Sequence, residues 1–396
     1  MSAEELGFLP DRLSRISDFI QTNYLDTGKL PFASLLIGRG DDIALDWSSG
    51  VAKDAIFRIA SMTKPVTSVA FMQLVEQGKV ALTDPVAKYI PEFAKLGVFV
   101  AGGGNVPFVS RPATSPMRVV DLLRHTSGLT YSFQERSNVD AAYRKTDVES
   151  WTKNTSQSFV DTLATIPLEF DPGTQWNYSV STDVLGVLIE RISGEALPDY
   201  FRDHIFVPLA MDDTFFTVPA DKASRIPECF AFDAETKTKL FDKAGPESLW
   251  TNGWSFNSGG GGLASTVADY YRFGRMLLNG GALDGVQIIG PKTLELMTAN
   301  HLPGGQDLTQ MSKSLFSEAE MTGIGFGLGF ATTIDSAATL TPCSTGDFYW
   351  GGMYSTAFFV DPVEDIIMVF MTQLMPSSTY PVRREIKTMI YSALAA

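Results

Sequence analysis

The sequence predicts an α+β protein, an α/β sandwich in which one antiparallel sheet is built from both chain ends and flanked by helices. Strand-like segments gather near the two ends of the chain, at residues 32–37 and 43–47 and again at 348–350, 355–360 and 366–372. The chain between them repeats apolar residues at helical spacing, which indicates a mainly helical domain inserted into the sheet domain.

The first part of the α/β domain is expected at residues 1–80. Residues 9–24 have the pattern of an amphipathic helix, and the two N-terminal strands follow it. A strand-like apolar run at residues 55–60 then leads into a helix that opens at Ser61 and ends near Gly78.

The inserted domain is expected at residues 81–290, and the second part of the α/β domain at residues 291–396. Apolar residues recur at helical spacing in four stretches of the insertion: residues 119–124, 159–164, 182–192 and 267–278. The second part adds a strand near residues 326–333 and closes with a helix at residues 383–394.

Composition and charge limit the class of protein. The chain has 396 residues, 44% hydrophobic and 19% charged, so it is long enough for two cores and too apolar to be disordered. A net charge of −14 without a basic cluster argues against nucleic acid and membrane surfaces as partners, and favours a small-molecule substrate. The oligomeric state is left open. No signal-peptide pattern is visible, so we expect a cytoplasmic protein.

The segment Ser61-Met62-Thr63-Lys64 places a hydroxyl and an amine one helical turn apart. Residues i and i+3 of a helix lie on one face with Cβ atoms about 5–6 Å apart, so the Lys64 amine can reach the Ser61 oxygen. Serine needs a neighbouring base to become a strong nucleophile, although a serine here can also be a helix cap. The same spacing recurs at Ser150, but without a preceding strand. We therefore predict that Ser61 is the nucleophile and that Ser150 has no catalytic role.

Proton transfer to a leaving group needs a second side chain, and Tyr178 is the candidate. It lies in a short polar and aromatic segment that precedes the helix expected at residues 182–192. A phenol beside a lysine can share its proton, so such a pair can act first as a base and then as an acid. The alternative is an ordinary buried tyrosine with one satisfied hydroxyl.

The remaining polar motifs suggest no metal ion and no cofactor. His125, His204 and His301 have no partners at metal-ligand spacing, and no G-x-S-x-G segment supports a Ser-His-Asp triad. We interpret His125 as structural. The Gly259–Gly262 run fits neither a dinucleotide-binding motif nor a P-loop, so close packing is expected there.

Three further segments are expected near a ligand or a cleft. Four glycines alternate with apolar residues: Gly323, Gly325, Gly327 and Gly329. On one strand all four would share a face and leave room for a ligand or another backbone. The stretches at residues 97–116 and 303–321 are expected to border the active-site cleft.

Five motifs, in order along the chain, resemble those of the serine β-lactamase and penicillin-binding-protein superfamily. They are Phe57 to Lys64, Leu122 to Leu129, Trp176 to Ser179, Gly260 to Thr266, and Trp350 to Gly352. Within this superfamily the chain looks like a family VIII carboxylesterase, a group similar to class C β-lactamases. The resemblance covers most of the chain and implies a β-lactamase/transpeptidase-like fold, with the active site in the cleft between its two domains.

The resemblance also implies a role for each matching residue. Ser61 would be the acylated nucleophile, and Lys64 and Tyr178 would be the base and acid pair. The backbone N–H groups of Ser61 and Met353 would form the oxyanion hole, where loss of one donor costs roughly 10²–10³ in rate.

Two departures from the family pattern concern the substrate. Class C β-lactamases carry an asparagine two residues after the tyrosine and Lys-Thr-Gly on an edge strand, where this chain has Val180 and Trp350-Gly351-Gly352. Apolar side chains in place of an amide and a cation favour small, uncharged carboxylic esters over anionic β-lactams. We therefore predict a serine carboxylesterase with substrate-binding positions at Trp350, Gly351, Gly352 and Val180.

Other activities stay open on the same resemblance. They are amide hydrolysis of the aminohexanoate-oligomer or D-amino-acid peptidase type, acyl transfer to an alcohol, and weak β-lactamase activity. A non-catalytic binder is disfavoured by the presence of Ser61, Lys64 and Tyr178, although a shared fold does not guarantee shared chemistry. Trp350 can also be read as a core residue under the sheet.

Overall fold

The computed structural model describes residues 1–312 and 321–395, and its centre is a seven-stranded antiparallel sheet of order β11-β12-β13-β14-β15-β1-β2. These strands are β1 (Ala33–Arg39), β2 (Asp42–Ser49), β11 (Ile324–Phe326), β12 (Ala331–Thr333), β13 (Phe348–Gly351), β14 (Ala357–Asp361) and β15 (Ile366–Met371). The N-terminal strand β1 pairs with the C-terminal strand β15, with Ser34 opposite Met371. Both chain ends therefore build one sheet, as the sequence predicted.

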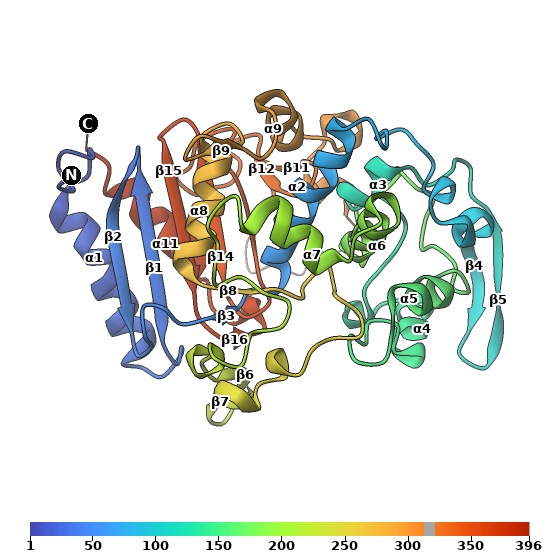
Figure 1. The fold of residues 1–396 in the computed structure, drawn as a ribbon, viewed down its shortest axis with the longest axis horizontal. Helices are drawn as coiled ribbons and strands as arrows, with labels where there is room; N and C mark the ends of the chain where they lie inside the picture. The colour runs from blue at the N-terminus through green and yellow to red at the C-terminus, as the bar shows by residue number, and fades with distance from the viewer. Residues whose placement is uncertain (313–320, 396) are drawn as a thin grey trace.

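Helices cover both faces of this sheet (Figure 1). One face carries α1 (Pro10–Ile20) and α11 (Val382–Ser392), which contact each other and share a core with Leu35 of β1 and Phe359 of β14. The helix predicted at residues 9–24 is α1 followed by a π-helical turn at Gln21–Leu25.

The other face carries α8 (Val267–Leu278), which contacts β1, β14 and β15. Its residues were expected within the helical insertion, and that placement differs from the structure. Gly274 of α8 approaches the sheet so closely that a Cβ there would lie 3.0 Å from Ile367 Cγ2. Helical periodicity in a sequence identifies an apolar face but not the surface on which that face packs.

The insertion is mainly helical but also contains strands. Its helices are α3 (Val119–Leu123), α4 (Asn138–Thr146), α5 (Ser156–Leu163), α6 (Ser181–Ser193) and α7 (Leu197–Phe201). One hairpin, β4 (Gly97–Gly103) and β5 (Val106–Pro112), lies at the end of the molecule far from α1 (Figure 1). A second, β6 (Cys229–Asp233) and β7 (Lys237–Asp242), pairs with β16 (Leu374–Met375). The sequence analysis missed both hairpins because β5 and β7 are largely exposed and carry little apolar alternation.

Apart from the central helix α2 (Thr63–Glu76), the remaining helices and strands are short. They are α9 (Pro291–Thr298), α10 (Leu308–Met311), the pair β3 (Phe57–Arg58) and β8 (Ala264–Ser265), and the pair β9 (Ala282–Leu283) and β10 (Val286–Gln287). Among the described residues, no helix combines the length and the apolar character needed to cross a membrane. The cytoplasmic location stays a prediction.

Helix α2 (Thr63–Glu76) is buried on all sides. Every side chain from Thr63 to Leu74 is buried, and the helix packs against α6 of the insertion. A helix with no solvent-facing stripe is typical of the centre of a large core. It follows directly on the 3₁₀ turn Ala60–Met62, in which Ala60 and Met62 are buried and Ser61 is half-buried.

The glycine-rich segment after residue 321 differs from the sequence expectation. It forms two strands, β11 and β12, joined by a turn in which the Gly327 N–H donates to the Phe330 carbonyl at 2.8 Å. Gly323 and Gly329 have φ angles of 76° and 104°, in the left-handed region that interrupts a strand. The four glycines therefore do not share the face of one strand. Gly327 does leave room for another backbone, as one of the two alternatives expected, since a Cβ there would clash with the Met297 carbonyl oxygen.

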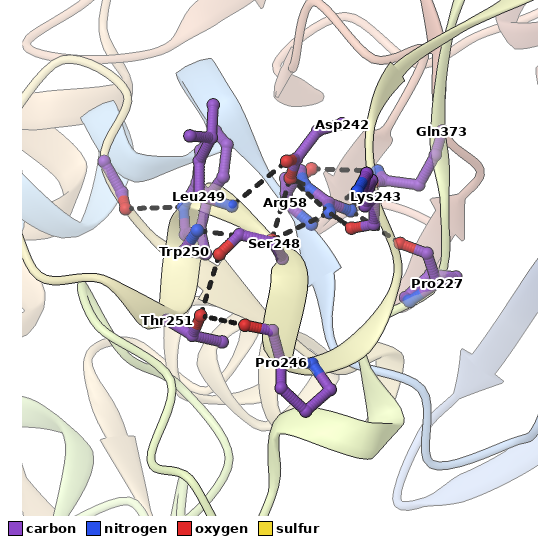
Figure 2. A network of polar contacts seen from close by, with 11 residues as sticks. Arg58, Pro227, Asp242, Lys243, Pro246, Ser248, Leu249, Trp250, Thr251 and Gln373 are labelled. Atoms are coloured by element: carbon purple, nitrogen blue, oxygen red, sulfur yellow. Dashed lines mark hydrogen bonds and ion pairs between the residues drawn. The ribbon is translucent and has the colours of Figure 1, made fainter.

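A buried polar network fixes the strand that leads to Ser61 (Figure 2). Arg58 is fully buried, and its Nε donates to Asp242 Oδ2 at 2.7 Å. Its guanidinium also donates to Ser248 Oγ at 2.9 Å and to Gln373 Oε1 at 3.1 Å, while Gln373 bonds both backbone groups of Arg58. The network therefore ties β3 to the end of β7 and to the residues after β15.

Arg58→Met is expected to lower the free energy of unfolding by about 3–5 kcal/mol, because loss of one partner of a buried ion pair leaves the Asp242 carboxylate uncompensated. Urea unfolding followed by tryptophan fluorescence measures the change. The control is Arg202→Met, since Arg202 is exposed and pairs with Asp199 and Asp203 at the surface, where little effect is expected. Similar small shifts in both variants would contradict a stabilising role for the network.

Candidate active site

Three predicted side chains meet at the start of α2. The Tyr178 hydroxyl donates a hydrogen bond to Ser61 Oγ at 2.6 Å, and Lys64 Nζ donates to the same oxygen at 3.2 Å. Lys64 is only 2% exposed and Tyr178 only 4%. Ser61 Oγ therefore has an amine and a phenol within hydrogen-bond reach, which is the geometry that nucleophilic catalysis requires.

The turn that carries Ser61 has an unusual backbone. Ala60 has a φ of 45°, in the left-handed region that residues with a side chain rarely adopt. Such conformations persist where the surrounding structure imposes them, and they are frequent at active sites. Here the Ile59 N–H donates to the Leu263 carbonyl at 3.1 Å on one side of the turn, and the buried helix α2 begins on the other.

A second hydrogen bond holds Lys64. Its Nζ donates to the Gly260 carbonyl at 2.6 Å, and it lies 4.6 Å from the ring centroid of Tyr178 and 5.3 Å from that of Tyr131. Burial holds the pKa of the Tyr131 hydroxyl well above its usual value, so this second phenol stays neutral. Lys64 is thereby confined between backbone and two aromatic rings, with Ser61 in reach.

The Gly259–Gly262 run is a close-packing segment, as predicted. A Cβ on Gly260 would clash with the Asp183 carboxylate. Asp183 Oδ1 instead accepts the Gly260 N–H at 3.1 Å and the Ser258 hydroxyl. Burial raises the pKa of Asp183, and the nearby charge of Lys64 opposes that shift. The packing therefore orients the carbonyl group that holds Lys64.

His125 lies behind this site and supports it. Its Nδ1 is 3.3 Å from Ser179 Oγ, whereas Ser127 Oγ is 2.7 Å from Ser181 Oγ, so no His125–Ser127 pair forms. Burial, with a contribution from the charge of Lys64, holds the pKa of His125 well below its usual value, and the ring is neutral. The ring centroid lies 5.0 Å from that of Tyr178. The structural interpretation of His125 agrees with these contacts.

Ser61 and Tyr178 line a cavity of about 800 Å³, and Lys64 lies buried behind them. Its lining includes eleven aromatic residues: Tyr131, Phe133, Trp151, Phe159, Trp176, Tyr178, Phe256, Tyr349, Trp350, Phe358 and Phe359. Trp350, on β13, is 7% exposed and packs 5.4 Å from the ring centroids of both Phe326 and Tyr178. Trp350 is both a core residue and part of the cavity wall, so the two interpretations of this residue from the sequence do not exclude each other.

The backbone groups expected in the oxyanion hole come from two segments that meet here. Ser61 and Met353 both line the cavity, as do Gly351 and Gly352. Gly352 lies against the turn of the predicted nucleophile, since a Cβ there would clash with the Ile59 carbonyl oxygen. The end of β13 therefore packs on the turn that carries Ser61, as an oxyanion hole with donors from both segments requires.

Val180 does not lie where the sequence analysis expected it. Its side chain is fully buried, and the residue is not part of the cavity lining. Val180 immediately precedes α6, and its N–H donates to the Thr130 carbonyl at 3.2 Å. Its side chain belongs to the main hydrophobic core, so the expected contact between Val180 and the substrate was wrong.

The second S-x-x-K segment shows different geometry. Lys153 is exposed and pairs with Asp147 at 2.6 Å, and Ser150 Oγ lies 3.5 Å from Thr152 Oγ1. The Lys153 amine is therefore paired with Asp147 and not with Ser150, in keeping with the prediction of no catalytic role for Ser150. Trp151, between them, nevertheless lines the cavity.

Four residues of the cavity lining were not predicted from the sequence: Tyr131, Phe133, Glu149 and Trp151. They lie in loops around α4, where no periodic pattern points to a shared surface. The one available signal was position, because Tyr131 follows closely on the motif that ends at Leu129.

Of the two stretches expected to border the cleft, only one contributes described residues to the cavity lining. None of residues 97–116 lines the cavity, because most of them form the β4–β5 hairpin. Met321, the last residue of the stretch 303–321, does line it. Residues 313–320 of that stretch lie outside the described residues.

Comparison with known proteins relates the chain to one family. A family model described as Beta-lactamase matches residues 20–388. Protein Rv1367c of Mycobacterium tuberculosis is 35% identical over 335 residues, which cover 84% of this chain and 80% of that protein. Esterase EstB of Burkholderia gladioli is 28% identical over 341 residues, covering 81% and 78%. The structure of EstCE1, described as a hydrolase with promiscuous acyltransferase activity, has a TM-score of 0.79 and 23% identity, covering 96% of this chain and 99% of its own.

Proposed function

The chain belongs to the beta-lactamase family, and on this basis we propose that it is a serine hydrolase, a carboxylesterase that cleaves small, uncharged carboxylic esters through an acyl-enzyme on Ser61. The observation that carries the proposal is the convergence of the Tyr178 hydroxyl and Lys64 Nζ on Ser61 Oγ. Further support comes from EstB, a similar protein that is named an esterase.

In the acylation step, Ser61 Oγ attacks the carbonyl carbon of the ester, and its proton passes to the Lys64–Tyr178 pair. The N–H groups of Ser61 and Met353 stabilise the negative charge that develops on the carbonyl oxygen. The bond between the carbonyl carbon and the alcohol oxygen then breaks, and Tyr178 protonates the departing alcohol. The acyl group remains on Ser61 Oγ.

Deacylation repeats these steps with water as the nucleophile. The Lys64–Tyr178 pair accepts a proton from the water as its oxygen attacks the acyl carbon. The bond to Ser61 Oγ breaks, Ser61 regains its proton from the pair, and the carboxylic acid leaves. The side chains return to their starting protonation states, so the cycle consumes only ester and water.

The cavity wall favours uncharged esters over anionic β-lactams. Trp350 stands where class C β-lactamases carry the lysine of their edge strand, so this position offers an apolar ring instead of a cation. Burial of an apolar acyl or alcohol group against such aromatic walls contributes about 25 cal/mol per Å². An alcohol is also a better leaving group than an amine and asks less of the acid Tyr178.

Covalent labelling tests the proposal directly. Exposure to a serine-directed organophosphonate is expected to add one adduct per chain to the wild-type protein and none to Ser61→Ala, as measured by intact mass. Turnover of p-nitrophenyl acetate and butyrate is followed in parallel. An adduct that persists in Ser61→Ala would overturn the site assignment, and the absence of both adduct and turnover would support a non-catalytic binder.

Acyl transfer and amide hydrolysis remain the alternatives, because the same acyl-enzyme serves each of them. EstCE1, whose fold this chain shares, is described as having promiscuous acyltransferase activity. Small alcohols added to the ester assay separate hydrolysis from transfer, since only a transferase forms the new ester. Matched ester and amide substrates separate an esterase from an amidase.

A further inference from the structure

Glu149 is a carboxyl side chain in the cavity wall that the proposed reaction does not use. It follows α4, and its Oε1 accepts a hydrogen bond from the Ser132 backbone N–H at 2.6 Å. Within residues 1–312 and 321–395, no basic side chain forms an ion pair with Glu149. Lys64 acts on it only through its charge, because its Nζ donates to Ser61 and Gly260.

Burial raises the pKa of Glu149 to about 7. Hydrogen bonds from Ser132 and the charge of Lys64 lower it, while the charge of Asp183 adds to the increase. Tyr131 and Tyr143, which also face this group, have pKa values well above their usual range because they are buried, so both stay neutral. A buried carboxyl without a positive partner costs free energy when ionised, and a bound cation would remove that cost.

Aromatic rings also line the cavity near Glu149. Tyr131 and Phe133 stack with their ring centroids 4.8 Å apart, and Trp151 follows Glu149 by two residues. The face of an aromatic ring attracts cations, and concave aromatic surfaces bind quaternary ammonium groups. Tyr131 stacks on Phe133 and carries Lys64 Nζ 5.3 Å from its ring centroid, so the rings left beside the Glu149 carboxyl group for a ligand are those of Phe133 and Trp151.

The basic residues of the cavity lining belong to a different part of the fold from Glu149. Arg383, Arg384 and Lys387 belong to α11, which covers the opposite face of the sheet from α2. Lys387 is paired with Asp347 at 2.6 Å, and Arg383 donates to the Thr356 carbonyl at 2.9 Å. These cations do not neutralise Glu149, and the net charge of −14 attracts positively charged ligands to the protein.

We propose that Glu149, together with the rings of Phe133 and Trp151, forms a subsite for a positively charged ammonium group of the substrate. This inference rests on the proposed ester hydrolysis and extends it beyond uncharged esters to esters whose acyl or alcohol part carries an amine. The carboxylate supplies the opposite charge, and the rings contact the alkyl groups of the ammonium ion and exclude water from it.

A matched pair of esters tests the subsite. Butyrylcholine carries a quaternary ammonium group, and 3,3-dimethylbutyl butyrate has the same shape without the charge. The ratio of their kcat/KM values, measured by pH-stat titration at pH 8 where Glu149 is mostly ionised, is the readout. We expect this ratio to fall at least about tenfold in Glu149→Gln relative to wild type. An unchanged ratio would overturn the proposal.

Asp147→Asn is the matched control. Asp147 lies two residues from Glu149, and its carboxylate is exposed and pairs with Lys153 outside the cavity. Its φ of 52° suits asparagine, so the variant removes the same charge without backbone strain. The ratio is expected to stay at the wild-type value. An equal fall in both variants would attribute the effect to net charge and would contradict a subsite at Glu149.

Tetramethylammonium binding tests the subsite without turnover. Because a ligand that binds the folded protein raises its melting temperature, tetramethylammonium chloride is expected to stabilise wild type above a sodium chloride reference, and Glu149→Gln much less. Equal shifts in both proteins would refute the subsite even if no ester were cleaved. Binding that depends on Glu149 without adduct or turnover would refute the proposed ester hydrolysis alone.

Discussion

Replacing Ser61 with alanine is expected to lower kcat/KM for p-nitrophenyl acetate by roughly 10³–10⁶-fold, the range found when a catalytic serine is removed from a serine hydrolase. Both the Tyr178 hydroxyl and Lys64 Nζ hydrogen-bond to Ser61 Oγ, so the substitution removes the oxygen on which the proposed acid and base act. Initial rates of p-nitrophenol release at matched protein concentrations measure the loss.

Ser150→Ala is the control for this substitution. It makes the same chemical change at the other S-x-x-K segment, where Lys153 pairs with Asp147 instead of the serine. Full activity is expected in Ser150→Ala, and the far-UV circular dichroism of both variants should match wild type. If Ser61→Ala retained more than a tenth of the wild-type rate, Ser61 would not be the nucleophile.

Replacing Tyr178 with phenylalanine is expected to lower kcat by roughly 10²–10⁴-fold, the usual contribution of a positioned acid or base. The variant removes only the hydroxyl that donates to Ser61 Oγ at 2.6 Å and keeps the ring that packs on Trp350. Because the ring and the cavity wall remain, KM should change much less than kcat. Steady-state kinetics with p-nitrophenyl butyrate separate the two constants.

Tyr200→Phe provides the matched comparison for Tyr178→Phe. Tyr200 is a buried tyrosine of α7 outside the cavity lining, so its hydroxyl is deleted from a similar environment. Wild-type kcat is expected for Tyr200→Phe. A small effect of Tyr178→Phe, equal to that of Tyr200→Phe, would mean that Lys64 alone accepts and donates the protons. The Tyr178 side chain would then contribute only packing contacts.

How far the site could be predicted depended on how local each contact is. The pairing of Ser61 with Lys64 follows from helix geometry, because a spacing of three places both side chains on one face. Tyr178 is 117 positions from Ser61, and no local rule joins them. Its polar and aromatic segment and then the family resemblance proposed it, and the fold brings its hydroxyl to 2.6 Å from Ser61 Oγ. Val180, two residues further, was misplaced because its backbone bond to Thr130 sends the side chain into the core.

The strands and helices could likewise be predicted only where a local sequence pattern marks them. The core strands β1, β14 and β15 were expected because they are buried and their sequences are therefore continuous apolar runs, which predict buried strands. The strand β5 is exposed, so its sequence has no continuous apolar run that would predict a strand. Periodicity also found the helix α8 but could not tell that its apolar face lies on the sheet, since a pattern along one segment carries no information about the segment that covers it.

By itself, the sequence determined the sheet built from both chain ends, the mainly helical insertion, and the pairing of a serine hydroxyl with an amine one helical turn away. These features arise from the spacing of residues within a few turns or strands, which local geometry fixes. Only the tertiary structure showed that Glu149 and the rings beside it face the cavity and that Val180 does not. A cavity wall is assembled from segments far apart in the chain, so its composition depends on long-range packing that no local pattern encodes.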